Sequence, residues 1–257
     1  MAKLIFLGTC SGTEPMPDMC HSAVVIETDG GYYWFDAGET CSRNAHLMGI
    51  DLLKVRSVFV SHPHMDHVGG LANLMWNIRK LTTISDARPI DSVVKCFLPN
   101  LKTWEGIMTI LSETEENFAC DYELESHHIS DGVVYEDRNI KVTAYHNHHL
   151  GEAEDGNWQS FSFCIETGNK RIIYSGDIRD EYDLDSIIGN GCDILIVETG
   201  HHKVKNICSY ATTKNVGKLL FTHHGREIIN NREEAECVLS QYPIDALICS
   251  DGLALEI

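Results

Sequence analysis

The sequence has few positive charges and no long apolar run. Lys and Arg number 20 against 38 Asp and Glu, so the formal net charge is -18. A chain this acidic repels polyanions on average, which argues against a general binder of nucleic acid or anionic membranes. No stretch approaches the roughly 18 apolar residues of a membrane-spanning helix, and the first residues lack a signal-peptide pattern. We therefore expect a soluble, cytoplasmic protein with no membrane contact.

Motifs that pair cysteines are absent as well. The 10 cysteines are scattered and include no C-x-x-C pair, whereas a disulfide framework belongs to short secreted chains. We expect reduced, mostly buried thiols. Hydrophobic residues make up 43% of the 257 residues and charged residues 23%, which is the balance of a globular protein with a core. We predict a single domain over residues 1–257.

Short apolar runs bounded by turn residues predict a strand-rich fold. The expected strands cover residues 4–7, 24–26, 32–35, 58–60, 93–98, 140–144, 161–165, 171–174, 194–197, 219–221 and 246–249. Thr28–Gly31 is typical of a hairpin turn, and helices are expected at 71–81, 104–111, near 208–217 and near 231–240. The Glu-rich stretch 112–130 is expected to be a solvated connection. Two halves with strands before helices favour two β-layers with helices outside.

The 14 histidines are unusually many, and one group of them decides the interpretation. A polar loop after the strand 58–60 holds His62, His64, Asp66 and His67. The two-residue step of an extended segment sends His62 and His64 to one side, while Asp66 and His67 face a second centre. A lone histidine is most often a surface or core residue, but this spacing favours metal binding. Imidazole and carboxylate suit Zn²⁺, and Mn²⁺ or Fe would accept the same donors.

The segment from Ser61 to Leu71 resembles the H-x-H-x-D-H signature of the metallo-β-lactamase fold superfamily. Other matches follow in the family's order along nearly the whole chain. They are Phe35–Glu39, Val142–His149, Tyr174–Asp177 and Leu219–His223. The resemblance is to the ribonuclease Z and phosphodiesterase-like branch, and it implies an α/β (α+β) fold, a four-layer αββα sandwich with the metals at one rim.

The resemblance also implies a ligand set for two divalent metal ions, with Zn²⁺ favoured. One ion is assigned His62, His64, His149 and Asp177, and the other is assigned Asp66, His67, Asp177 and His223. His148 is the alternative to His149, because both end the same expected strand. His223 is preferred to its neighbour His224 because a Thr-His pair ends the family's strand. Asp36 is expected to support the ligands without touching the metal.

This site predicts a hydrolase that uses a metal-bridging hydroxide. The resemblance favours a phosphodiesterase acting on a small phosphodiester or nucleotide. One alternative is hydrolysis of a carboxylic ester, thioester or lactone; others are a tRNA 3′-processing endonuclease and a non-hydrolytic metal-binding member. RNA is not favoured, because the chain is acidic, has no glycine- and proline-rich arm, and has Val197 where the family places a His before Glu198. A homodimer is a further expectation.

Three residues are predicted to take part in catalysis itself, namely Asp66, Glu198 and His224. Asp66 is expected to orient the attacking water as well as ligate metal. His201, His202 and His224 are each candidates to protonate the leaving group. Arg226 is a candidate for a phosphate oxygen or an ordinary surface residue.

Overall fold

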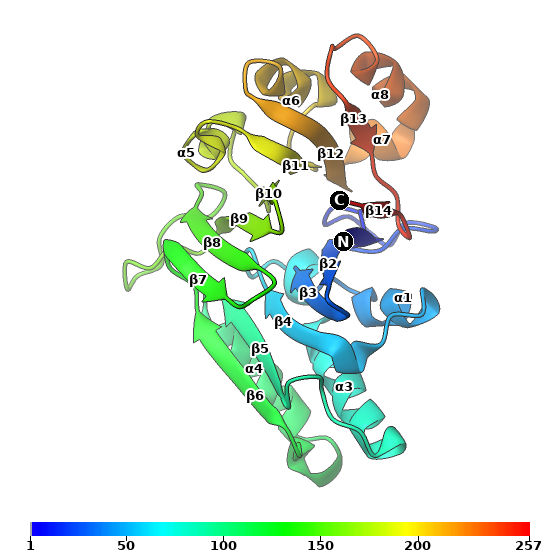
Figure 1. Cartoon of the computed structure of the whole chain (residues 1–257), viewed down its shortest axis with the longest axis vertical. Coiled ribbons are helices and arrows are strands. Elements are labelled where there is room, and N and C mark those ends of the chain that lie inside the picture. The colour runs from blue at the N-terminus through cyan, green and yellow to red at the C-terminus, as the bar shows by residue number, and fades with distance from the viewer. Residues whose placement is uncertain (1) are drawn as a thin grey trace. The chain divides into compact units, whose positions relative to one another are not determined.

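The computed structural model describes residues 2–257, which group into two compact units. The first unit contains the N-terminal strand, Cys20–Ile129 and Asp251–Ile257, and the second contains Thr9–Met19 and Ser130–Ser250. Each unit is built on one seven-stranded sheet (Figure 1). The prediction of one domain over residues 1–257 stays a prediction.

The sheet of the first unit has the order β14-β1-β2-β3-β4-β5-β6. Its strands are β1 (Lys3–Gly8), β2 (Ala23–Thr28), β3 (Gly31–Phe35), β4 (Val55–Phe59), β5 (Val93–Leu98), β6 (Glu123–His128) and β14 (Ala254–Glu256). β2 and β3 form the predicted hairpin. Asp29 and Gly30 in its turn have φ of 50° and 68°, as a two-residue turn that follows the strand twist requires.

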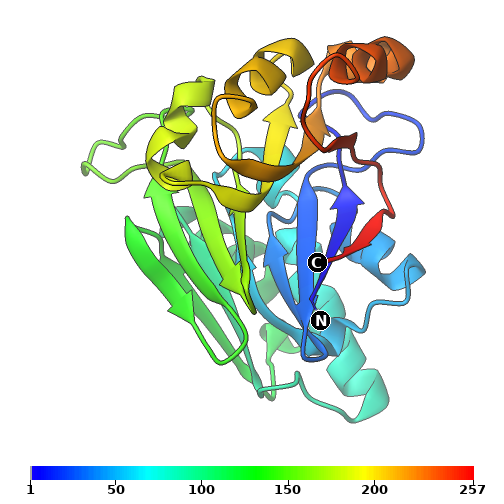
Figure 2. The ribbon, with the colours of Figure 1, turned by 45° about the horizontal axis from the view of Figure 1, so that its top comes forward.

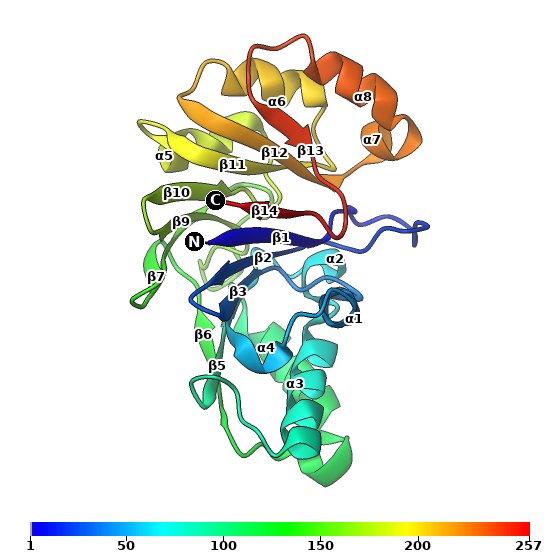
Figure 3. The same cartoon turned by 45° about the vertical axis from the view of Figure 1, so that its right-hand side comes forward.

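The helices of the first unit cover one face of its sheet (Figure 3). They are α1 (Cys41–Leu47), η1 (Leu52–Lys54), α2 (Met65–Val68), α3 (Leu71–Ser85), α4 (Leu101–Ser112) and η2 (Glu115–Phe118). The apolar stripe predicted from helical spacing is the buried face of α3, since Leu71, Leu74, Met75 and Ile78 have no exposed surface. This packing fixes the start of α3, where the polar loop that follows β4 ends.

The expectation of a solvated connection over residues 112–130 is wrong, because this stretch contains η2 and the strand β6. β6 lies at the edge of the sheet and pairs with β5 on one side. Its side chains are exposed or half-buried throughout. An edge strand with charged side chains needs no apolar run, so its polar composition concealed it.

The sheet of the second unit has the order β13-β12-β11-β10-β9-β8-β7. Its strands are β7 (Gly132–Glu136), β8 (Lys141–His146), β9 (Phe161–Thr167), β10 (Lys170–Tyr174), β11 (Cys192–Thr199), β12 (Val216–His224) and β13 (Ala246–Ile248). Neighbours from β7 to β10 are antiparallel, as the green ribbons of Figure 2 show, and those from β10 to β13 are parallel. Because β10, β11 and β12 are parallel, their carboxyl ends meet at one edge.

The helices of the second unit pack against one face of its sheet, on buried residues from β9 to β13 (Figure 3). They are η3 (Glu181–Leu184), α5 (Asp185–Ile188), α6 (Val204–Ala211), α7 (Arg226–Asn230) and α8 (Arg232–Leu239). The longest helix among residues 2–257 is α3, with 15 residues, and none in this range is long and apolar enough to cross a bilayer.

The buried face of α3 predicts a large loss of stability on truncation. Leu74→Ala removes a fully buried side chain, and we expect it to lower the free energy of unfolding by about 2–5 kcal/mol through lost burial and the cavity left behind. Ile84→Ala on the same helix is the control, because that side chain is 78% exposed. Urea unfolding in EDTA measures both, and equal effects would contradict the assignment of the buried face.

Candidate metal centre

Asp36 fixes the histidine loop of the first unit. It follows β3, is fully buried, and has φ of 63°, a conformation that Asp adopts more readily than most residues. Its Oδ1 accepts a hydrogen bond from the Ser61 amide at 2.6 Å. Its Oδ2 accepts from the Ser61 hydroxyl and from His67 Nδ1, both at 2.8 Å. As predicted, this carboxylate supports the residues of the H-x-H-x-D-H segment.

Two glycines allow this loop to pack tightly against the segment after Asp36. The Gly70 amide donates to the Ala37 carbonyl at 2.8 Å. A Cβ built on Gly70 would lie 2.2 Å from the Gly38 carbonyl oxygen, and one on Gly38 would lie 2.4 Å from the Asp66 carbonyl oxygen. Neither position has room for a side chain, so both glycines are needed for the path of the loop.

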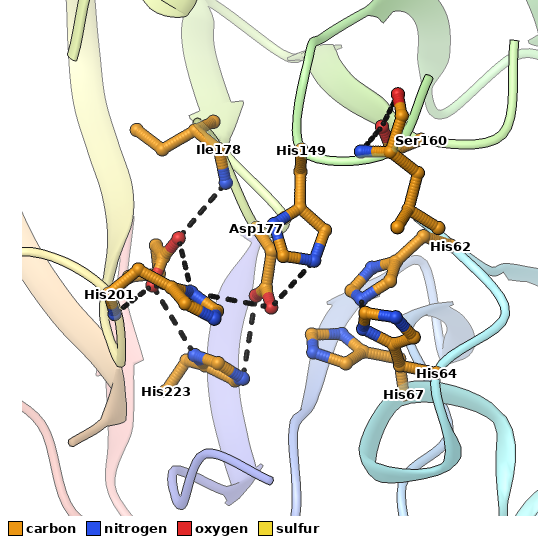
Figure 4. A network of polar contacts seen from close by, with 12 residues as sticks. His62, His64, His67, His149, Ser160, Asp177, Ile178, His201 and His223 are labelled. Atoms are coloured by element: carbon orange, nitrogen blue, oxygen red, sulfur yellow. Dashed lines mark hydrogen bonds and ion pairs between the residues drawn. The ribbon is translucent and has the colours of Figure 1, made fainter. Parts of the chain in front are cut away.

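The three imidazoles of the loop converge (Figure 4). His62 Nε2 lies 3.0 Å from His64 Nδ1, and the ring centroids of His62 and His67 are 4.0 Å apart. Asp66 Oδ2 lies 3.3 Å from His67 Nε2. The first unit therefore brings together all four residues that the motif predicted, and their nitrogen and oxygen donors suit a divalent cation.

In the second unit, Asp177 lies at the centre of the candidate ligands (Figure 4). It follows β10 in a turn where Gly176 has φ of 55°, and its side chain is buried. Asp177 Oδ1 lies 3.4 Å from His223 Nε2, and Oδ2 lies 3.7 Å from His149 Nε2. His148 instead places Nδ1 2.5 Å from Asp183. The structure thus brings His149, and not His148, to Asp177.

A bulge in β12 separates His223 from His224. The register with β11 shifts between Glu198 and Thr199, and His223 has φ of 49°. Bulges re-aim side chains in this way next to functional sites. His223 faces Asp177, whereas His224 is fully buried, with Nε2 2.8 Å from the Cys249 carbonyl and Nδ1 3.2 Å from the Thr199 hydroxyl.

His224 is therefore placed in the core, and its burial lowers its pKa to about 4. The ring is neutral at physiological pH, and both nitrogens face groups of the fold. These contacts do not suit a group that must reach a substrate. The predicted catalytic role of His224 receives no support from this placement.

Glu198 is a buried carboxylate that organises its neighbours. Oε1 accepts from the Ile178 amide and Oε2 from the His201 amide, both at 2.9 Å. Oε2 also lies 2.9 Å from His201 Nδ1 and 3.5 Å from His223 Nδ1. Burial alone would raise the pKa of Glu198, but the contacts with His201 and His223 outweigh it and lower that pKa. The predicted catalytic role of Glu198 stays a prediction.

His201 joins this cluster although the ligand prediction left it out. Its Nδ1 lies 3.7 Å from Asp177 Oδ2, and its side chain is 47% exposed. The hydrogen bond with Glu198 raises the pKa of His201. The signal in the sequence is an acid at the end of a strand followed three residues later by a histidine.

The donors of the second unit fit a divalent cation. One ligand atom from each of four residues lies within 4.8 Å of the others, in the set Asp177, Glu198, His201 and His223. Burying a carboxylate costs free energy unless positive charge lies beside it. The imidazoles of His201 and His223 lie beside Glu198, and a cation such as Zn²⁺ would supply that charge to Asp177, with imidazole nitrogens completing its surroundings.

A family model described as Anti-Pycsar protein Apyc1 matches residues 2–207. The chain belongs to the Anti-Pycsar Apyc1 family. The matched range contains every candidate ligand described above except His223.

Curated relatives of this Anti-Pycsar Apyc1 family member are named ribonuclease Z. The protein from Picrophilus torridus is 26% identical over 86% of this chain and 85% of its own length. The one from Halobacterium salinarum is 25% identical over 99% of this chain and 97% of its own. The similarity therefore runs along both units.

Solved structures with a similar fold are metallo-β-lactamase-fold proteins. YhfI from Bacillus subtilis covers 100% of both chains with a TM-score of 0.74 at 16% identity. The short form of human tRNase Z covers 99% of both with a TM-score of 0.71 at 18% identity. Yeast PDE1 covers 100% of this chain and 99% of its own, with a TM-score of 0.68 at 13% identity. The predicted superfamily and αββα fold are confirmed, and the chain is a hydrolase of this fold.

The buried contacts of Asp36 predict a cost for losing its charge. In Asp36→Asn the amide cannot accept all three hydrogen bonds from Ser61 and His67, so we expect a loss of about 2–4 kcal/mol in the free energy of unfolding. Asp29→Asn is the matched control, since Asp29 also has positive φ but is exposed. Its expected effect is within about 0.5 kcal/mol. Urea titrations in EDTA that gave both variants the same midpoint would refute this role of Asp36.

Proposed function

We propose that this Anti-Pycsar Apyc1 family member is a phosphodiesterase that hydrolyses a small phosphodiester or nucleotide with two divalent cations. Zn²⁺ is the favoured metal, and Mn²⁺ or Fe are the alternatives. The observation that carries the proposal is the convergence of imidazoles and carboxylates in each unit. The residues that would hold the ions are His62, His64, Asp66, His67, His149, Asp177 and His223. Two such cations would lower the pKa of a shared water and provide hydroxide near neutral pH.

His201 is the residue that we propose to protonate the leaving alkoxide. Its side chain is about half exposed, and its Nδ1 lies 2.9 Å from Glu198 Oε2. This contact orients the ring and leaves Nε2 for proton transfer. A carboxylate behind an imidazole favours the imidazolium, the form that a general acid needs. His202 is less suited, because its Nε2 lies 3.0 Å from the Ile178 carbonyl.

Asp66 is the residue that we propose to orient the attacking water. Its side chain is 12% exposed and Oδ2 lies 3.3 Å from His67 Nε2, so the carboxylate borders the imidazole cluster while retaining some access. An ionised carboxylate accepts a hydrogen bond from a water molecule and so fixes the direction of the lone pair on the water oxygen. Arg226 has no part in this proposal, since it pairs with Glu14 on the surface.

The relatives support a phosphodiester over a carboxylic ester, because ribonuclease Z acts on RNA. The net charge of -18 opposes a long polyanion and favours a small substrate, whose few charges are repelled less. Processing of tRNA is the second candidate, and the observation that favours it is the ribonuclease Z similarity over 99% of the chain.

A substrate panel tests the proposed activity. We expect metal-loaded protein to hydrolyse bis-p-nitrophenyl phosphate and cyclic nucleotides, and to leave a lactone, a thioester and a precursor tRNA unchanged. Chelation should abolish turnover, and Zn²⁺ or Mn²⁺ should restore it. Turnover of the lactone or thioester alone would replace the proposed reaction with carbonyl hydrolysis, and trimming of the precursor tRNA would replace the proposed substrate.

The role of His201 predicts an effect that depends on the leaving group. For a diester with an alkoxide leaving group, we expect His201→Ala to lower kcat about 10²–10⁴-fold, the usual contribution of a general acid. For bis-p-nitrophenyl phosphate the loss should be much smaller, because p-nitrophenolate departs without a proton. His128→Ala, which removes an exposed imidazole on β6, is the control. Equal losses on both substrates, together with reduced metal content, would make His201 a ligand instead.

A further inference from the structure

Asp183 is a buried carboxylate with three contacts. It lies in η3, and its side chain is 2% exposed. Oδ2 accepts hydrogen bonds from the backbone amides of His148 and Arg179, at 3.2 Å and 2.9 Å. Oδ1 lies 2.5 Å from His148 Nδ1. One side chain is therefore bound to two backbone segments that are far apart in the sequence.

These two segments carry two of the candidate metal ligands. His148 immediately precedes His149, and Arg179 lies two residues after Asp177. His149 Nε2 and Asp177 Oδ2 are 3.7 Å apart. The hydrogen bonds of Asp183 thus fix the loop of one ligand relative to the turn of the other.

We propose that Asp183 is a positioning residue that holds His149 and Asp177 at the separation needed for a shared cation. This role rests on the proposed function, because it needs a cation at those two residues. Groups that orient metal ligands from behind commonly contribute about 10–100-fold in metal affinity. Asp183 is suited to this, because a charged acceptor gives stronger hydrogen bonds than a neutral one.

The ionisation of Asp183 agrees with this role. Burial raises the pKa of the carboxyl, but the hydrogen bonds from His148 and the Arg179 amide outweigh burial and bring that pKa below its ordinary value.

Asn147 supports the same loop from its other end. Its side chain is buried, Oδ1 accepts from the His149 amide at 3.2 Å, and Nδ2 donates to the Ser162 hydroxyl at 3.1 Å.

The chain contains, in Asp131, a control for the contacts between Asp183 and His148, although its side chain is 52% exposed and that of Asp183 is 2% exposed. Asp131 accepts from the His146 amide at 2.7 Å and lies 2.6 Å from His146 Nδ1. This is the same pair of contacts that Asp183 makes with His148. Both hydrogen bonds of Asp131 go to His146, so Asp131 does not bind the turn that carries Asp177.

The test compares Asp183→Ala, Asp183→Asn and Asp131→Ala in the full chain. Chelator competition measures the dissociation constant for Zn²⁺, and the visible absorption of the Co²⁺-loaded protein reports ligand geometry. We expect Asp183→Ala to weaken Zn²⁺ binding about 10–100-fold and to change the Co²⁺ spectrum. Asp183→Asn keeps an oxygen for the two amides, so its loss should be intermediate. Asp131→Ala should match the wild type in both measurements.

The outcomes separate this role from the proposed function. A wild-type protein that binds neither Zn²⁺ nor Co²⁺ overturns the proposed function and this role with it. A wild type that binds, with an Asp183→Ala variant that binds equally tightly, overturns the role alone. Equal weakening in Asp183→Ala and Asp131→Ala also overturns it, because the loss would then be general. If Asp183→Ala does not fold in EDTA, the Asp183→Asn variant tests the role instead. An intermediate loss of Zn²⁺ affinity in that variant supports the role, and wild-type affinity contradicts it.

Discussion

The burial of carboxylates among imidazoles is the constraint on which this molecule depends. Asp36, Asp177 and Glu198 have almost no exposed surface, and an ionised carboxylate in such surroundings is stable only beside donors or positive charge. Asp36 is surrounded by the Ser61 and His67 donors. Glu198 is held by backbone amides and by histidines. The chemistry proposed for the protein follows from this arrangement.

Strand ends place these groups. Asp36 follows β3, Asp177 follows β10, and Glu198 is near the end of β11. Local backbone geometry then aims the side chains: Asp36 and His223 both have positive φ, and the bulge at His223 turns it toward Asp177. Conformations of this kind cost free energy and persist where the surrounding packing demands them. The regular strands supply position, and the irregular residues supply direction.

Part of this could be predicted from the sequence. His62, His64 and His67 lie in one short loop, so their spacing in the sequence was enough to predict a metal site. The apolar stripe of α3 was likewise enough to predict that helix. The edge strand β6 was missed because pairing on one side does not need an apolar run. β7 was missed although it contains the short apolar run 133–135. The place of Asp183 depends on contacts between a 3₁₀ helix and two segments that are distant in the sequence, which no local pattern records. The sequence favoured His223 over its neighbour His224 as a ligand only through the resemblance of its Thr-His pair. The structure supplies the physical reason, because the bulge in β12 turns His223 toward Asp177 and leaves His224 in the core.

The account requires that these donors bind cations. Its most direct test is metal analysis of protein purified without added metal, with the content per folded chain determined by mass spectrometry. We predict about two ions of Zn²⁺ or Mn²⁺ per chain, the number of a two-metal hydrolytic site, and a content that falls when Asp177 is replaced by Ala. A folded chain that retains no metal and takes up none from a Zn²⁺ buffer would contradict the account.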